Sequence, residues 1–293
     1  MSGPVVAGVD GSRPSLAAAE WAAREAVARG AALRLVHAFP PMPWRISPVP
    51  GVDAWQQVGE QMLQRTVSEF ADRHPDLDVS GEHTDAEPDE ALLTAAASAG
   101  LLVVGARGWG GFDGLAVGCV ALRVTSAADC PVVMVPGAER QGVPEGDDTG
   151  EVQLGFNAHV PVDETTDFAF RAAQERDAVL RVVHAWALPP ASRSAWMLTI
   201  LEEDRATWED QESQAVADAL RGWRERHPEV SVLPDAVLLN PAQALVTSSE
   251  RARLLVVGRR TSPRPAERQL GPVAHAVLHH ARCPVAVVPH VAP

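Results

Sequence analysis

The sequence predicts an α/β protein built from two tandem, doubly wound domains, each with a parallel sheet of five strands. Short, continuously apolar segments alternate with longer helix-forming segments, which is typical of parallel strands buried on both faces. The same alternation returns in the second half of the chain. The length of 293 residues also exceeds that of a typical single domain of about 150 residues, so two domains are expected.

The repetition is visible in individual segments. LLVVG at 101–105 recurs at 254–258, and CPVVMVP at 130–136 recurs as CPVAVVP at 283–289. WAAREAVARGAALRLVHAF at 21–39 aligns with 168–186. Self-similarity over this distance indicates two copies of one structural unit.

In the first copy, apolar β-branched runs alternate with alanine- and leucine-rich runs. The expected strands are 4–10, 32–39, 77–83, 101–105 and 131–136. The expected helices are 16–30, 55–73, 88–100 and 118–128. Ser15 is the expected N-cap of the first helix, and Gly30 is its expected C-terminal stop.

The segment between the copies has the composition of an exposed linker, because it is rich in Gly, Pro and acidic residues. We therefore expect a first domain at 1–137, a linker at 138–150 and a second domain at 151–293.

Composition excludes several function classes. The net charge of -13 argues against a nucleic-acid partner, since duplex binding needs clustered cations. All 25 basic residues are arginine, so a Schiff-base lysine and the lysine of a phosphate-binding P-loop are absent. Three cysteines without a C-x-x-C pair indicate a reducing compartment, so we expect a cytoplasmic protein. We expect neither an export signal nor a membrane span.

A glycine-rich segment follows the strand at 101–105. Gly108, Gly110, Gly111 and Gly114 lie between Gly105 and Gly118, just before a predicted helix. Glycine exposes backbone amides, and helix N-termini attract anions, so this segment is a candidate phosphate site. The alternative is a surface loop without a ligand.

Four motifs stand out along the first copy: VVAGVDGS, VHAF, LLVVGARGWGGFDGLAVG and CPVVMVP. In order and spacing they resemble the universal stress protein family in its tandem, actinobacterial-like form. The resemblance implies a Rossmann-like, adenine-nucleotide alpha-hydrolase-like fold with strand order 3-2-1-4-5. It also implies that the two domains pair within one chain across their fifth strands. Whether two chains associate further stays open.

The family's nucleotide-binding pattern is G-x2-G-x9-G followed by Ser or Thr. Gly105, Gly108 and Gly118 match its spacing, but Cys119 occupies the hydroxyl position. A side-chain hydrogen bond contributes roughly 0.5–1.5 kcal/mol, so this substitution should weaken ATP binding several-fold without abolishing it.

The resemblance implies that ATP is the ligand, with Mg²⁺ as a candidate metal bound beside it, and it assigns further residues to the site. It places Asp10 near the base, ribose or metal, and Ala38 beside the adenine. Arg107 is a candidate phosphate contact. A turn carboxylate at Asp10 and a solvated arginine at Arg107 are the alternatives. The complete expected set is Val9, Asp10, Ala38, Gly105, Arg107, Gly108, Gly118, Cys119 and Val120.

The second copy departs from this pattern. Asn157 replaces Asp10, Thr261 replaces the second glycine, and Pro272 follows the last one. We therefore expect the second domain to bind ATP poorly and to act as a structural partner. His275, His279 and Cys283 share one helical side, but they span about 12 Å, too far for a single ion. No metal site is expected there.

These observations predict a stress-response protein that binds ATP in its first domain and acts through protein partners rather than through turnover. The alternative is a nucleotide-independent interaction module on the same fold. An ATP-using enzyme ranks third, because the sequence contains no identifiable acid/base pair.

Overall fold

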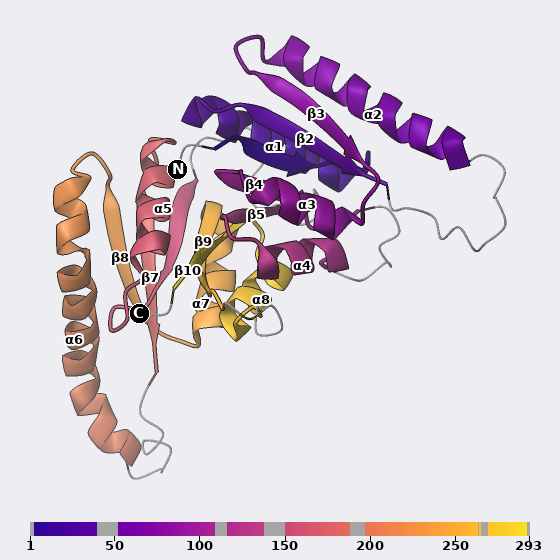
Figure 1. Ribbon diagram of the computed structural model, residues 1–293. Coiled ribbons are helices and arrows are strands. Elements are labelled where there is room, and N and C mark those ends of the chain that lie inside the picture. The colour runs from indigo at the N-terminus through magenta and orange to yellow at the C-terminus, as the bar shows by residue number, and fades with distance from the viewer. Residues whose placement is uncertain are drawn as a thin grey trace. The chain divides into compact units, whose positions relative to one another are not determined.

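A computed structural model describes residues 3–39, 52–108, 116–137, 150–187, 197–262, 264 and 269–291 (Figure 1). The chain divides into two compact units. Unit 1 comprises Met1–Arg140 with Thr261–Leu270, and unit 2 comprises Gln141–Arg260 with Gly271–Pro293. The predicted linker lies outside the described residues except for Gly150, and the predicted domain limits stay a prediction.

Unit 1 contains a parallel sheet in the order β3-β2-β1-β4-β5, as predicted. Its strands are β1 (Val5–Gly8), β2 (Leu33–Ala38), β3 (Val79–Thr84), β4 (Leu101–Gly105) and β5 (Val132–Val135). Its helices are α1 (Arg13–Arg29), α2 (Val52–Arg73), α3 (Pro88–Ala96) and α4 (Cys119–Ala127). The strand order reverses between β1 and β4, and ligands of doubly wound sheets bind beyond such a reversal.

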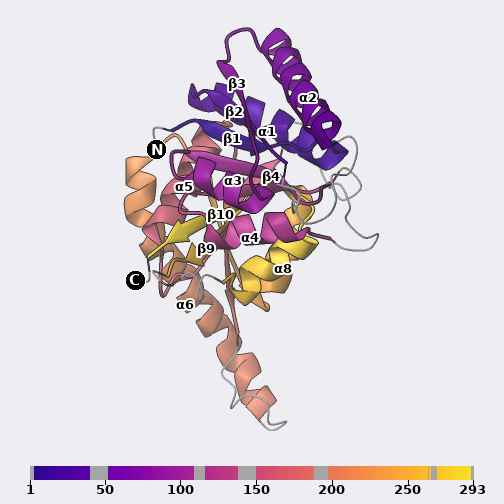
Figure 2. The ribbon, with the colours of Figure 1, turned by 45° about the vertical axis from the view of Figure 1, so that its right-hand side comes forward.

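Unit 2 repeats this topology in the order β10-β9-β6-β7-β8. Its strands are β6 (Glu151–Phe156), β7 (Leu180–Trp186), β8 (Val232–Leu238), β9 (Ala252–Arg260) and β10 (Val285–His290). Its helices are α5 (Asp163–Gln174), α6 (Met197–Arg226), α7 (Pro241–Ser248), the 3-10 turn η3 (Ser249–Arg251) and α8 (Pro272–His280). In each unit a long helix runs beside the edge strand: α2 runs beside β3 (Figures 1 and 2), and α6 runs beside β8 (Figure 1).

One part of the core of unit 1 lies between its sheet and an alanine face of α1. Strand residues such as Val6, Leu35 and Leu102 are fully buried. The fully buried helix residues that meet the sheet are Ala18, Ala19, Ala22, Ala23 and Ala26. Small side chains on this face allow the helix to lie close to the strands. This close packing fixes the start of α1 near the carboxyl end of β4.

The cap of α1 corrects one sequence prediction. The N-cap is Ser12, not Ser15, and the Ser12 hydroxyl accepts a hydrogen bond from the Ser15 amide at 3.3 Å. The helix starts earlier because Pro14 suits its first turn and needs no N–H partner. Gly30 ends the helix in the left-handed conformation, with φ of 58°, as predicted.

Helix α3 is shorter than the sequence predicted. It stops at Ala96 rather than Gly100. The Gly100 amide donates to the Pro4 carbonyl at 3.0 Å, so the chain has already left the helix and turned toward β4. Among the described residues, no helix is both long and apolar enough to cross a membrane.

Candidate functional site

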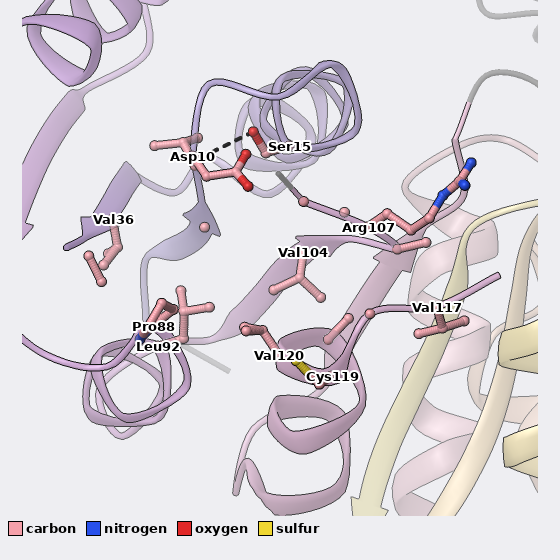
Figure 3. Close-up of a pocket in the computed structure, with 18 residues that line it drawn as sticks. Asp10, Ser15, Val36, Pro88, Leu92, Val104, Arg107, Val117, Cys119 and Val120 are labelled. Atoms are coloured by element: carbon pink, nitrogen blue, oxygen red, sulfur yellow. Dashed lines mark hydrogen bonds between the residues drawn. The ribbon is translucent and has the colours of Figure 1, made fainter. Parts of the chain in front are cut away.

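A cavity of about 470 Å³ opens at the carboxyl ends of β1, β2 and β4 in unit 1 (Figure 3). It is bounded by the turn after β1 and by the starts of α3 and α4. All nine residues of the expected nucleotide-site set line this one cavity. They are Val9, Asp10, Ala38, Gly105, Arg107, Gly108, Gly118, Cys119 and Val120.

Asp10 ends the first strand segment and begins a tight turn. Its Oδ1 accepts a hydrogen bond from the Ser12 amide at 2.9 Å, and its own amide donates to the Ser15 hydroxyl at 3.2 Å. Gly11 follows with φ of 79°, a conformation that favours glycine. The turn directs the carboxylate toward the cavity, where its Oδ2 faces Gly108.

The three glycines of the pattern have different structural roles. A Cβ at Gly105 would lie 2.7 Å from the Pro14 carbonyl oxygen, so this glycine permits β4 to approach the start of α1. A Cβ at Gly108 would collide with the Asp10 carboxylate. A Cβ at Gly118 would meet the Ala106 oxygen at an ordinary 3.6 Å. Gly108 therefore leaves the space in front of Asp10 open.

The N-terminus of α4 forms another wall of the cavity. Gly118 is its N-cap and provides no side-chain hydrogen bond, while the Gly118 amide donates to the Ala106 carbonyl at 2.7 Å. The next amides belong to Cys119, Val120 and Ala121, and the first-turn amides of a helix have no acceptor within it. These amides and the helix dipole create an anion-attracting surface. The Cys119 thiol is exposed there.

The other side of the cavity is apolar. Sequence reasoning found Val9 and Ala38 but missed Val36, Pro88, Leu92 and Val104, which also line the cavity. The alternation within β2 could have found Val36, because residues two apart in a strand face the same side. Pro88 and Leu92 required knowledge of where α3 packs. An apolar slot beside an anion-attracting helix end suits a planar heterocycle that carries a phosphate.

The three ionisable side chains among the described lining residues are Asp10, Arg107 and Cys119. Arg107 is half-buried in the short segment that leaves β4. The next part of the glycine segment, 109–115, lies outside the described residues. Gly110, Gly111 and Gly114 therefore stay sequence predictions as phosphate-wrapping positions.

Unit 2 differs at the corresponding positions. Asn157 forms the same turn as Asp10, since its Oδ1 accepts a hydrogen bond from the His159 amide at 3.1 Å. β9 continues to Arg260, with Arg259 and Arg260 paired to β10, whereas β4 ends at Gly105. The residues that leave the sheet in unit 1 thus remain in a strand in unit 2. Pro272 occupies the first turn of α8 and supplies no amide donor.

The fold and site define a class of protein with two tandem α/β domains of the adenine-nucleotide alpha-hydrolase-like type. A sequence profile described as the universal stress protein family matches residues 1–136 and 160–289. The chain belongs to the universal stress protein family.

Individual relatives agree with this assignment. Universal stress protein Rv2623 of Mycobacterium tuberculosis strain H37Rv is 32% identical over 290 residues, covering 97% of this chain and 95% of the relative. Universal stress protein Rv2005c of the same strain is 31% identical over 294 residues, covering 97% and 96%. A crystal structure of a universal stress protein from Archaeoglobus fulgidus DSM 4304 matches with a TM-score of 0.66 at 14% identity. That match covers 99% of each chain and supports the fold.

Proposed function

We propose that this chain is a cytoplasmic stress-response protein that binds one ATP in unit 1 and acts through protein partners without turning the nucleotide over. The observation that carries this proposal is the convergence of nine sequence-assigned residues on one cavity of about 470 Å³. The cavity volume falls within the range of about 300–1,000 Å³ that is usual for small-molecule sites.

The chemistry of the walls supports ATP in a definite orientation. The first turn of α4 and Arg107 attract the phosphates, while the slot beside Val36 and Leu92 receives the adenine. The Asp10 carboxylate would hold Mg²⁺ or accept a hydrogen bond from the ribose. When bound, Mg²⁺ would neutralise phosphate charge that Arg107 alone leaves uncompensated.

The same walls favour binding without hydrolysis. Asp10 is the one carboxylate among the described lining residues, and the lining contains no histidine. Hydrolysis needs a group that activates water and a group that stabilises the leaving phosphate, and Asp10 is already a hydrogen-bond acceptor in its own turn. We therefore propose that binding of ATP, rather than its hydrolysis, regulates how the protein acts on its partners.

The test is a calorimetric titration of nucleotide-free protein with ATP, with and without Mg²⁺. We expect one equivalent of ATP per chain and no released ADP over the time of the measurement. Gly108→Trp should abolish binding, because a side chain there enters the space in front of Asp10.

Asp10→Asn isolates the carboxylate charge. Unit 2 already forms this turn with Asn157, so the variant should keep the fold while losing the Mg²⁺-dependent part of the affinity. Asn157→Ala is the matched control and should leave ATP binding unchanged. Binding of two equivalents, or binding that Gly108→Trp does not alter, would contradict a single site in unit 1.

A second candidate function is a nucleotide-independent interaction module. Cys119 offers a weak S–H donor instead of a hydroxyl, and the Gly118 amide is already bonded to Ala106. Both features remove donors that a phosphate would use. No binding at millimolar ATP, with the fold intact by circular dichroism, would favour this alternative.

A further inference from the structure

Three side chains of unit 2 converge away from the sequence-assigned site. Nε2 of His159 and Nε2 of His184 each lie 2.9 Å from the same oxygen, Oε2 of Glu212. One ligand atom from each residue lies within 4.8 Å of the others. The three residues come from the turn after β6, from β7 and from α6. We call this group the His-His-Glu cluster.

The cluster is anchored at one end and open at the other. The His184 side chain is 3% exposed, that of Glu212 is 21% exposed, and that of His159 is 61% exposed. A ligand could therefore reach the group from solvent on the His159 side. When a ligand binds, the buried His184 would keep its position, and the exposed His159 would adjust.

The His184 ring is oriented by the backbone. Its Nδ1 lies 3.3 Å from the Phe156 carbonyl oxygen, and the Ala158 amide lies 3.4 Å away and donates to Nδ1 when that nitrogen carries no proton. When Nδ1 carries the proton, it donates to the carbonyl and leaves the Nε2 lone pair facing Glu212. A histidine ligand held by a backbone carbonyl through its other nitrogen is the usual arrangement at metal sites.

The two nitrogen-to-oxygen distances in the cluster are close to the ligand spacing of a tetrahedral site, and the two nitrogens lie within 4.8 Å of each other. Ligands about 2.0–2.1 Å from Zn²⁺ are separated by roughly 3.3 Å in tetrahedral geometry. The two nitrogen-to-oxygen distances of 2.9 Å would need to open by only a few tenths of an ångström. Each contact as it stands is a hydrogen bond from an Nε2–H to the Glu212 carboxylate. When a metal ion binds, each imidazole would carry its proton on Nδ1, so that the Nε2 lone pair could coordinate the ion.

The described residues of unit 1 form no such cluster, although its fold is the same. His37 occupies the position of His184, and its Nδ1 lies 2.8 Å from the Val9 carbonyl oxygen. Ser12 stands in the turn where unit 2 has His159, and both amides bond to the side chain two residues earlier. Gly59 stands in α2 where α6 carries Glu212, and a Cβ there would lie 2.6 Å from Nε2 of His37.

We propose that His159, His184 and Glu212 form a Zn²⁺ site in unit 2, with water as the fourth ligand. Imidazole nitrogen is a borderline ligand that Mg²⁺ and Ca²⁺ bind poorly, so a set of two imidazoles and one carboxylate suits Zn²⁺ better than either of them. Nothing in the sequence pattern predicted this site, because its residues are far apart in the chain. The proposal does not depend on nucleotide binding in unit 1.

The experiment uses the full chain after dialysis against a chelator. Zn²⁺ alone is titrated by calorimetry, and Co²⁺ alone is added while visible absorption is recorded. We expect one equivalent of either metal and the intense Co²⁺ bands of four-coordinate geometry. His159→Ala and Glu212→Gln should each weaken Zn²⁺ binding by at least the roughly 10–100-fold that loss of a supporting group costs.

The matched control is His275→Ala in α8. His275 and His279 have ring centroids 4.5 Å apart and form another histidine pair among the described residues. This variant should leave the affinity and the Co²⁺ spectrum unchanged. His159 is largely exposed, so His159→Ala removes a ligand without opening the core. Circular dichroism checks that each variant is folded.

Two results would overturn the proposal. One is the absence of saturable Zn²⁺ binding by the wild-type chain. The other is one-equivalent binding that His159→Ala and Glu212→Gln leave unchanged. If His275→Ala alone removed the metal, the ion would belong to the α8 pair, and the His-His-Glu cluster would be a hydrogen-bond network only.

Discussion

The two cysteines Cys119 and Cys283 illustrate how position decides the chemistry of one residue type. Cys283 precedes β10 and is 2% exposed, and burial raises the pKa of its thiol to about 12. Cys119 is exposed at the first turn of α4. Thiolate is the reactive form of cysteine. The Cys283 thiol should therefore react slowly for two reasons: its raised pKa keeps it protonated, and its burial keeps reagents away.

We predict that a thiol reagent at pH 8 modifies Cys119 and spares Cys130 and Cys283 in the native chain, since both are buried. Mass spectrometry after a short exposure should find one label per chain, and three after denaturation. Because Cys119 lines the cavity, the labelled protein should bind ATP more weakly. Full affinity after complete labelling would remove Cys119 from the site.

Replacing the same residue tests the missing hydroxyl. Cys119→Ser should tighten ATP binding by roughly 2- to 10-fold, the factor that corresponds to one hydrogen bond of about 0.5–1.5 kcal/mol. Calorimetry compares the variant with the wild type under identical Mg²⁺. Cys119→Ala serves as the control, and it should not tighten binding. A Ser variant no better than the Ala variant would show that the side chain does not meet the phosphates.

Comparison of the units also separates two roles at Asp10. Asn157 supports the same turn in unit 2, so the turn does not need a negative charge. What Asp10 adds in unit 1 is charge beside the cavity. The two oxygens of Asp10 therefore differ in role: Oδ1 accepts a hydrogen bond from the turn, and Oδ2 faces Gly108.

His37 should make unit 1 sensitive to acid. Burial lowers its pKa, a trend that His83 reinforces and that the Val9 carbonyl and Asp10 oppose. Its stabilising contribution is therefore complete above the unfolded pKa of about 6.5 and is lost as pH falls below it. We expect denaturant unfolding to show a loss of stability between pH 7 and pH 5, at most about 1.4 kcal/mol per pH unit for this residue.

His37→Asn is the comparison for that measurement, because its amide can donate to Val9 without titrating. The variant should lose less stability over the same pH range. An identical pH dependence in both proteins would assign the effect to other groups.

At the scale of elements, α2 has a glycine at the point where it packs against the His37 imidazole. Gly59 lies in the middle of this helix, where glycine costs about 1 kcal/mol relative to alanine. The cost is tolerated because a Cβ there would lie 2.6 Å from Nε2 of His37, which is itself held by Val9. A helix former at this position would displace a buried ring.

Gly59→Ala should therefore destabilise the protein by about 1–3 kcal/mol, the usual cost of overpacking. Gly222→Ala in α6 is the matched control, since Gly222 is exposed and a Cβ there would meet nothing within 4 Å. This control should gain up to about 1 kcal/mol. Both values come from denaturant titrations, and a stabilising Gly59→Ala would contradict the packing argument.

Elements were predictable from sequence to the extent that their signals were local. Apolar runs fixed the strands, and Gly30 marked the end of α1. Ser15 was mistaken for the cap because both Ser12 and Ser15 are good capping residues, and only the turn at Asp10 chooses between them. The extension of β9 to Arg260 depends on its pairing with β10, which no local signal reveals.

The candidate sites follow the same rule. The glycine spacing and the family resemblance led to nine lining residues, because they fall at the ends of strands whose order could be predicted. The cavity's α3 residues and the His-His-Glu cluster were missed. Each depends on the face that a helix presents to a strand distant in sequence, and this follows from packing rather than from spacing.

At the scale of the whole molecule, the two units should respond to different ligands. We predict that ATP slows amide hydrogen exchange at the turn after β1 and at the start of α4. Zn²⁺ should instead slow exchange at β7 and the facing part of α6. Mass-spectrometric exchange with each ligand alone and with both tests this. Protection of the same peptides by both ligands would contradict two independent sites.

The duplication has a consequence for how such a protein can change. In a dimer of identical chains, every substitution appears in both copies, so Ser12 and Gly59 could not be kept in one subunit while histidine and glutamate arise in the other. Joining the copies in one gene removes that constraint. The turn that carries Asp10 and Ser12 in one half carries Asn157 and His159 in the other, so the two copies of the unit already differ at matching positions.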